Sequence, residues 1–101
     1  MNQQFINGPK WGKIVQKFLR SELAKKDIDY PELSERLLAL GTHQTPANLR
    51  SKVSKGILGA QLLFQILLVL RVRKLDWELI EELYEDSTGV EKPVVDSDNT
   101  P

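Results

Sequence analysis

The chain has 101 residues, of which 41% are apolar and none is cysteine, so the composition supports one small cytoplasmic domain and excludes a disulfide framework. The first residues lack the basic and apolar regions of a signal peptide, and the longest apolar run, residues 62–70, is far below the roughly 20 residues that cross a bilayer, so we expect no membrane association. The net charge is zero, but residues 1–75 hold 13 Lys or Arg and 5 Asp or Glu, a balance of +8, whereas residues 76–101 hold one Lys and 9 acids, a balance of −8.

The first predicted elements are a flexible lead-in over residues 1–8 and a helix over residues 10–26. Apolar residues at helical spacing indicate the side of this helix that faces the core: Trp11, Ile14, Val15, Phe18, Leu19 and Leu23. A basic stripe occupies another side, formed by Lys10, Lys13, Lys17 and Arg20. Such a stripe is either a solvated face or a surface that contacts phosphates, and a basic body is what a polyanion ligand requires.

Two start signals and two stop signals predict a pair of short helices. Asp29-Tyr30-Pro31-Glu32 has the form of a capping box with proline in the first turn, and Gly41 stands where a left-handed residue ends a helix. Thr45-Pro46 repeats the start, and Gly56 repeats the stop. We expect a helix of about ten residues, a turn of about four, and a second helix over 46–55, which is the pattern of a helix-turn-helix. The inward stripe of the first helix would be Leu33, Leu37, Leu38 and Leu40.

The second helix of this pair has a polar and basic outward face that suits the major groove of DNA. Leu49 and Val53 fall on the inward side. The predicted DNA-binding residues are Gln44, Thr45, Ala47, Asn48, Arg50, Ser51, Lys52 and Lys55. Amide side chains can pair with adenine, lysine can reach guanine or phosphate, and small residues allow close approach to the bases, while Arg50 and Lys52 would flank the helix and hold phosphates. The alternative is an ordinary solvated helical face.

Two further helices and a tail complete the predicted chain. A fourth helix over about 60–71 is apolar nearly all round and must be covered, and a fifth begins after Asp76, with Trp77, Ile80, Leu83 and Tyr84 inward and an acidic outer face. Residues 86–101 are expected to be a disordered acidic tail, which leaves residues 9–85 as the folded domain. Because the fourth helix carries more apolar surface than one short neighbour hides, we expect a homodimer formed through the fourth and fifth helices.

Residues 11 to about 75 resemble a family of small, largely uncharacterised bacterial proteins built on a domain of unknown function, itself similar to the lambda-repressor-type helix-turn-helix fold. The resemblance rests on Trp11, Tyr30, Leu33, Leu37, Gly41, and the blocks 19–25, 48–56 and 62–64. Two features depart from the pattern: Gly59 replaces the more usual serine N-cap, and the second helix of the pair is about one residue longer. The resemblance implies an all-α, compact five-helix domain, and it implies DNA binding by analogy.

Enzymatic chemistry finds no support in the sequence. There is no cysteine, the one histidine is His43 in the predicted turn, and neither a phosphate-binding loop nor a spaced metal-ligand set occurs, so we expect no enzyme, cofactor or metal. The carboxylates of Glu78, Glu81, Glu82 and Glu85 are more simply a solvated face than an ion site. The predicted function is a small bacterial or phage transcriptional regulator that binds double-stranded DNA. The alternative is a protein interaction module, such as an antitoxin, a phage inhibitor or an adaptor, in which the helix-turn-helix is only a scaffold.

Overall fold

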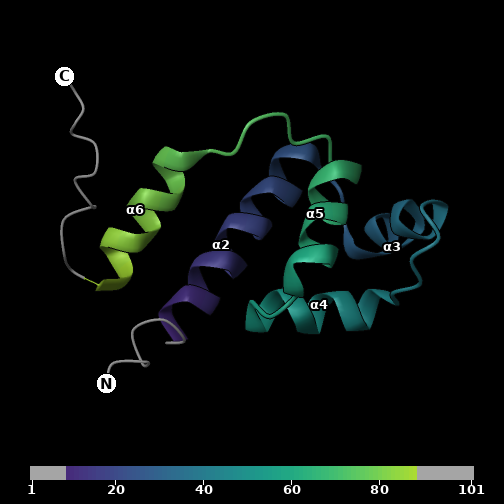
Figure 1. Cartoon of the computed structure of the whole chain (residues 1–101), viewed down its shortest axis with the longest axis horizontal. Helices are drawn as coiled ribbons and strands as arrows, with labels where there is room; N and C mark the ends of the chain where they lie inside the picture. Colours follow the sequence, from purple (N-terminus) through teal and green to yellow (C-terminus); the bar gives the residue numbers. More distant parts are fainter. Residues whose placement is uncertain (1–8, 89–101) are drawn as a thin grey trace.

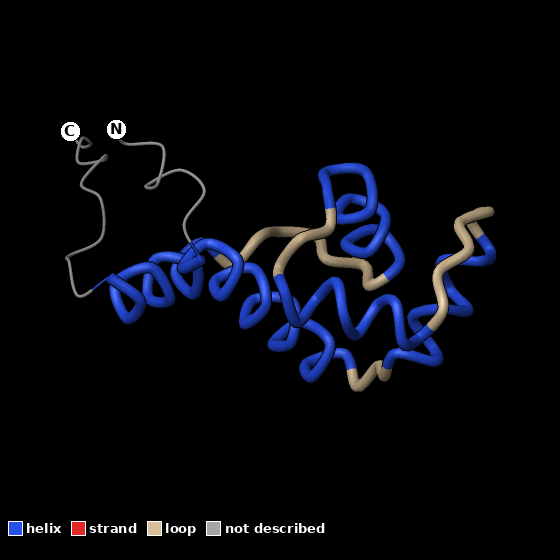
Figure 2. Tube along the Cα trace, turned by 90° about the horizontal axis from the view of Figure 1, so that it is seen from below, coloured by secondary structure: helices blue, strands red, loops and turns tan. Residues whose placement is uncertain are grey.

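The computed structural model describes residues 9–88, which form helices and connecting loops without a strand (Figures 1 and 2). The helices are α2 (Pro9–Lys26), α3 (Tyr30–Ala39), α4 (Pro46–Lys55), α5 (Gly59–Val69) and α6 (Trp77–Thr88). The predicted all-α class and five helices are therefore confirmed for this part of the chain. The predicted lead-in, residues 1–8, and residues 89–101 of the predicted tail lie outside the described residues.

The helix boundaries follow from local caps. Asp29 Oδ1 accepts a hydrogen bond from the Glu32 N–H at 3.0 Å, and Asp76 Oδ1 accepts one from the Leu79 N–H at 3.1 Å, so both predicted N-caps are confirmed. Gly41 adopts the predicted left-handed conformation, with φ +91°, after α3. α6 continues to Thr88, so the prediction that the tail starts at residue 86 is wrong by three residues.

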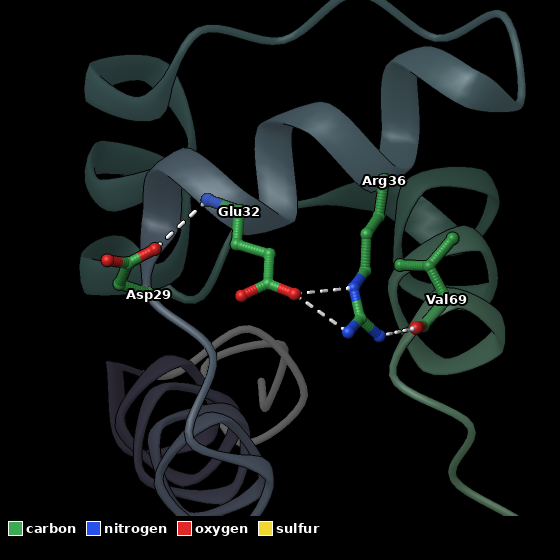
Figure 3. A network of polar contacts seen from close by, with 4 residues as sticks. All are labelled: Asp29, Glu32, Arg36 and Val69. Carbon is green, nitrogen blue, oxygen red and sulfur yellow. Dashed lines mark hydrogen bonds and ion pairs between the residues drawn. The ribbon is translucent and has the colours of Figure 1, made fainter.

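Only one of the two hydrogen bonds of the predicted capping box forms at the start of α3, the one that Asp29 accepts. The Glu32 carboxylate does not return to the start of its helix but pairs with Arg36, one turn later, at 2.8 Å (Figure 3). Arg36 in turn donates from Nη1 to the carbonyl oxygen of Val69, at 2.8 Å. Since Val69 is the last residue of α5, this guanidinium satisfies a carbonyl that has no partner within the helix, and it fastens α3 to α5.

The core lies where α2, α3, α4 and α5 meet. Its most deeply buried side chains are Leu19, Leu33, Leu37, Leu49, Val53, Ile66 and Leu70. Four of the predicted inward residues are not in it, because Trp11, Leu38, Leu40 and Trp77 are exposed by 40%, 56%, 47% and 61%. Helical spacing assigns a residue to one side of its own helix, but the neighbouring helices decide how far the covered arc extends.

α6 lies at the edge of this core and packs against α2, on the side of α2 away from α3 and α5 (Figure 1). The rings of Trp11 in α2 and Tyr84 in α6 are 5.7 Å apart between centroids, and Leu79, Ile80 and Leu83 lie against buried residues. α5 and α6 are thus separated by α2. In the dimer expected through the fourth and fifth helices, α5 and α6 would therefore have to contribute from opposite sides of α2.

Within residues 9–88, no single helix is both long enough and apolar enough to span a membrane. α4 and α5 reach the required length and composition only when they are taken together, and the chain direction turns by 113° between them. Their apolar residues Leu49, Val53, Leu62 and Ile66 are buried in the core.

Candidate functional site

α4 carries the predicted site, and local signals at both of its ends fix its position. Thr45 is the N-cap, and its Oγ1 accepts a hydrogen bond from the Asn48 N–H at 3.0 Å. Gly56 ends the helix in the left-handed conformation, with φ +68°. Leu49 and Val53 are buried, so the predicted range 46–55 and the predicted inward side are both confirmed. α4 lies along one edge of the molecule, with α3 and α5 on its inner side (Figure 1).

The outward side of α4 is a contiguous polar surface. The exposed residues on it are Thr45, Ala47, Asn48, Arg50, Ser51, Ser54 and Lys55. Six of these seven belong to the predicted set. Ser54 does not, although its position at 100° per residue, between Ala47 and Arg50, already places it on the outward side. Short side chains at Ala47, Ser51 and Ser54 leave the backbone of the helix accessible, while Asn48 and Lys55 project from it.

The two predicted flanking cations differ in their surroundings. The Arg50 guanidinium lies over the ring of Tyr30, 5.2 Å from its centroid, in a cation–π contact between α4 and the start of α3. This contact holds the Arg50 charge at the surface beside α4. Lys52 is half-buried on the other flank of α4, so the covered part of its long side chain lies against the fold while its charged end can remain in water.

The sequence predicts that the amide of Gln44 is free to pair with adenine, but in the structure its oxygen is buried. Its side-chain oxygen Oε1 is buried without a hydrogen-bond partner in the described part of the chain, and its backbone oxygen accepts from Ser34 Oγ at 2.6 Å. The side-chain acceptor of Gln44 is therefore turned away from the outward face. Thr42 and Gln65 hydrogen-bond through their side chains, and together these two contacts fix the connection between α3 and α4. His43 is exposed in this connection.

A second element reaches the C-terminal end of α4 through a direct contact of two glycines. A Cβ placed on Gly56 would lie 2.1 Å from the carbonyl oxygen of Gly12, and a Cβ placed on Gly12 would lie 2.8 Å from that of Lys55. The backbones of α2 and α4 therefore touch here, as only glycine allows. The contact brings the exposed Lys13, next to Gly12, into the neighbourhood of the exposed Lys55. Sequence reasoning identified Gly56 as a helix stop, but it did not identify Gly12 as its partner.

The sequence around α4 is free of acidic residues over a long stretch. Residues 36–75 contain seven Lys or Arg and no Asp or Glu. The basic stripe of α2 adds to this charge, because Lys10, Lys13, Lys17 and Arg20 are all exposed. Five acidic residues lie on α6, on the far side of α2 from α5 (Figure 1), and five more lie within residues 22–35. The arrangement leaves α4 with a positive, polar surface that attracts anions.

The acidic residues of α6 do not converge on an ion site. Within the part of the chain that the structure describes, no group of three or more His, Cys, Asp or Glu side chains is placed to hold a metal ion. Glu78 and Glu82 are exposed, while Glu81 and Glu85 are partly covered.

A comparison with protein families places the chain in one of them. The domain of unknown function DUF6471 matches residues 11–75, a stretch that starts in α2, includes α3, α4 and α5, and ends just before α6. Neither a curated protein nor a solved structure matches the chain. Since the match covers more than half of the sequence, the chain belongs to the DUF6471 family.

Proposed function

We propose that this protein is a non-enzymatic, sequence-specific DNA-binding protein that reads the major groove with α4, as a small transcriptional regulator does. The observation that carries the proposal is the outward face of α4. Its exposed residues are small, polar or basic, and no acidic residue occurs between residues 36 and 75. A helix of this kind can enter the groove, because short side chains admit the backbone and neighbouring cations neutralise phosphates.

The arrangement of α3 and α4 supports the same proposal. The two helices have ten residues each and are joined by residues 40–45, and Arg50 and Tyr30 connect them at the surface. We infer that this pair is a helix-turn-helix of the lambda-repressor type, in which the second helix is the reading helix. Asn48 and Ser51 would approach base edges, while Arg50, Lys52 and Lys55 would contact phosphates or guanine. Lys13 of α2 would extend the phosphate contacts beyond the end of α4.

The proposal is tested by affinity selection from a random duplex DNA pool, followed by binding measurements over salt concentrations from about 50 to 200 mM. We expect a preferred sequence and a steep loss of affinity as salt rises, because each phosphate contact releases counterions. Failure to enrich any sequence, together with no duplex binding at the lowest salt, would rule out DNA recognition.

Two variants locate the reading surface. Asn48→Ala should cost about 1–3 kcal/mol on the preferred site and relax specificity at one base pair, since the amide side chain is exposed and only the backbone N–H of Asn48 serves the cap. Lys55→Ala should weaken binding to all duplexes and reduce the salt slope by about one. Lys74→Ala removes the same charge from the linker before α6 and serves as the control, with little expected effect.

One observation favours the alternative, a protein interaction module. Phe64 and Leu68 on α5 are exposed by 68% and 64%, and exposed apolar side chains that lie together mark surfaces that bind protein. This observation does not compete with DNA binding, because α5 lies on the inner side of α4, away from the proposed reading face (Figure 1).

A further inference from the structure

The outer side of α5 is an apolar surface that the described fold leaves open. Phe64 and Leu68 are one helical turn apart and are exposed by 68% and 64%, and Ile57, just before the helix, is exposed by 70%. Leu62 and Ile66 are buried on the opposite side of the same helix. Ala60 and Gln61 are exposed between the large residues. We call Ile57, Ala60, Gln61, Phe64 and Leu68 the α5 face.

The absence of charge from residues 56–70 favours a partner surface that is also uncharged. The whole chain is 28% charged, but residues 56–70 contain no Asp, Glu, Lys or Arg. A partner of opposite charge would find nothing to pair with on the α5 face. Two copies of the face, in contrast, can meet without repulsion, and a two-fold axis requires a surface that is complementary to itself in this way.

The exposed apolar area of the α5 face would supply about half of one partner's share of a dimer contact. Ile57, Phe64 and Leu68 are each about two-thirds exposed, which corresponds to roughly 400 Å² of apolar surface, about half of what one partner buries in an ordinary stable interface. Beyond Leu68 lies an open groove of about 680 Å³, whose lining is apolar at Leu40 and Val72 but also includes Arg36, Arg71 and Arg73. Only the apolar edge of this groove, at Leu40 and Val72, would extend the contact, because the arginines of two copies repel each other.

The direction of α5 decides how two copies would be related. The chain turns by 113° between α4 and α5, so α5 runs closer to perpendicular than to parallel to α4, and it extends away from the outward face of α4 (Figure 1). If two α5 helices pair in parallel, both α4 helices lie on the same side of the dimer. An antiparallel pair would place them on opposite sides, where they could not contact one duplex.

We propose that the α5 face binds the α5 face of a second copy, with the two helices parallel, to form a symmetric homodimer. The pairing itself rests on the α5 face, and only its parallel direction rests on the proposed DNA-binding function. α6, which the sequence predicts to share the dimer contact, has no part in the proposed pairing, since α2 separates α6 from α5. The dimer would present two α4 helices to half-sites about one helical turn apart.

Sedimentation equilibrium of the full chain, without DNA, tests the pairing. We expect a dimer at tens of micromolar, and we expect Phe64→Glu to weaken dimerisation by a factor of about 10 or more, because it places two carboxylates at the two-fold axis. Trp77→Glu is the matched control: Trp77 is exposed by 61% on α6, and its substitution should leave the dimer unchanged. A monomeric wild-type chain at these concentrations, or a dimer that Trp77→Glu disrupts and Phe64→Glu does not, would overturn the proposal.

Disulfide trapping tests the direction of the helices, since the chain has no cysteine of its own. Gln61→Cys and Leu68→Cys are single substitutions seven residues apart, or about 10 Å along the helix. A parallel pair brings each introduced cysteine close to its own copy, so both variants should form covalent dimers on oxidation. An antiparallel pair can bring at most one of them together, so trapping of one variant alone, or of neither in a dimer that sedimentation detects, contradicts the parallel arrangement. This readout contains no DNA, so its failure is separate from a failure of the DNA-binding proposal.

Discussion

At the scale of single residues, the backbone contact between α2 and the end of α4 depends on Gly12 and Gly56. Gly56 needs a left-handed conformation, at φ +68°, and it also lacks room for a Cβ, because the backbone of Gly12 occupies that space. Gly41 shares the left-handed requirement, with φ +91°, but a Cβ there would meet nothing within 4 Å. The two positions therefore separate the cost of a strained backbone from the cost of a steric clash.

Gly41→Ala and Gly56→Ala should consequently differ in stability. We expect Gly41→Ala to lower the free energy of unfolding by about 1 kcal/mol, which is the left-handed penalty alone. Gly56→Ala should lower it by about 3 kcal/mol or more, because α2 and α4 must also move apart. Chemical denaturation followed by circular dichroism measures both values. Equal losses would mean that the contact with Gly12 yields without cost.

At the scale of helices, polar side chains fasten the pair α3 and α4 to the rest of the fold. Arg36 joins α3 to the end of α5, Thr42 joins the connection between α3 and α4 to Gln65, and Ser34 holds the backbone of Gln44. These contacts fix the direction of α4 relative to α5. Since the proposed dimer uses α5 and the proposed DNA contact uses α4, the same contacts would set the spacing between two reading helices.

Removal of the Arg36 donors should loosen this attachment. Arg36→Met retains most of the aliphatic length and loses the bonds to Val69 and Glu32, and we expect a loss of about 1–2 kcal/mol in the free energy of unfolding. Glu32→Gln is the control, because it removes only the exposed ion pair within α3, which contributes about 0.5 kcal/mol or less. Thermal and chemical denaturation of both variants would measure the difference. If the two losses are the same, the bond to the Val69 carbonyl adds nothing to stability.

At the scale of the whole molecule, α6 is a helix at the edge of the fold with one main neighbour, α2. It packs mainly on α2, where Trp11 and Tyr84 meet, and it lies outside the matched family domain, which ends at residue 75. α3, α4 and α5 share the main core with α2. A helix at the edge of the fold with one main neighbour can separate while the other helices stay packed together.

Native-state hydrogen exchange should therefore resolve two levels of protection. We expect the amides of α6 to exchange through a local opening whose free energy is at least about 1 kcal/mol lower than that of global unfolding. The amides of Leu49 and Ile66 should exchange only through global unfolding. Trp11→Ala should lower protection in α6 more than in α4, whereas Trp77→Ala, at an exposed position, should change neither. Identical opening free energies for α4 and α6 would show a single cooperative unit instead.

The sequence by itself determined the helices of this protein and the orientation of α4. Caps and stops act over three or four residues, so Asp29, Thr45, Gly56 and Asp76 specify the ends of helices without help from the fold. The range of α4 and its buried residues followed from these signals, and so did most of its exposed face. The last residue of α6 did not follow from local signals. Polar residues such as Asp86 and Ser87 have similar free energies inside a helix and in the coil that follows it.

Only the tertiary structure decided what each helix face meets. The contact between Gly12 and Gly56, the inward turn of the Gln44 side chain, and the open α5 face around Phe64 depend on residues far apart in the chain. The same is true of α6, which follows α5 in the sequence but packs on α2. Periodicity along one helix reports which residues can be buried, and the arrangement of the other helices in space decides which of them are.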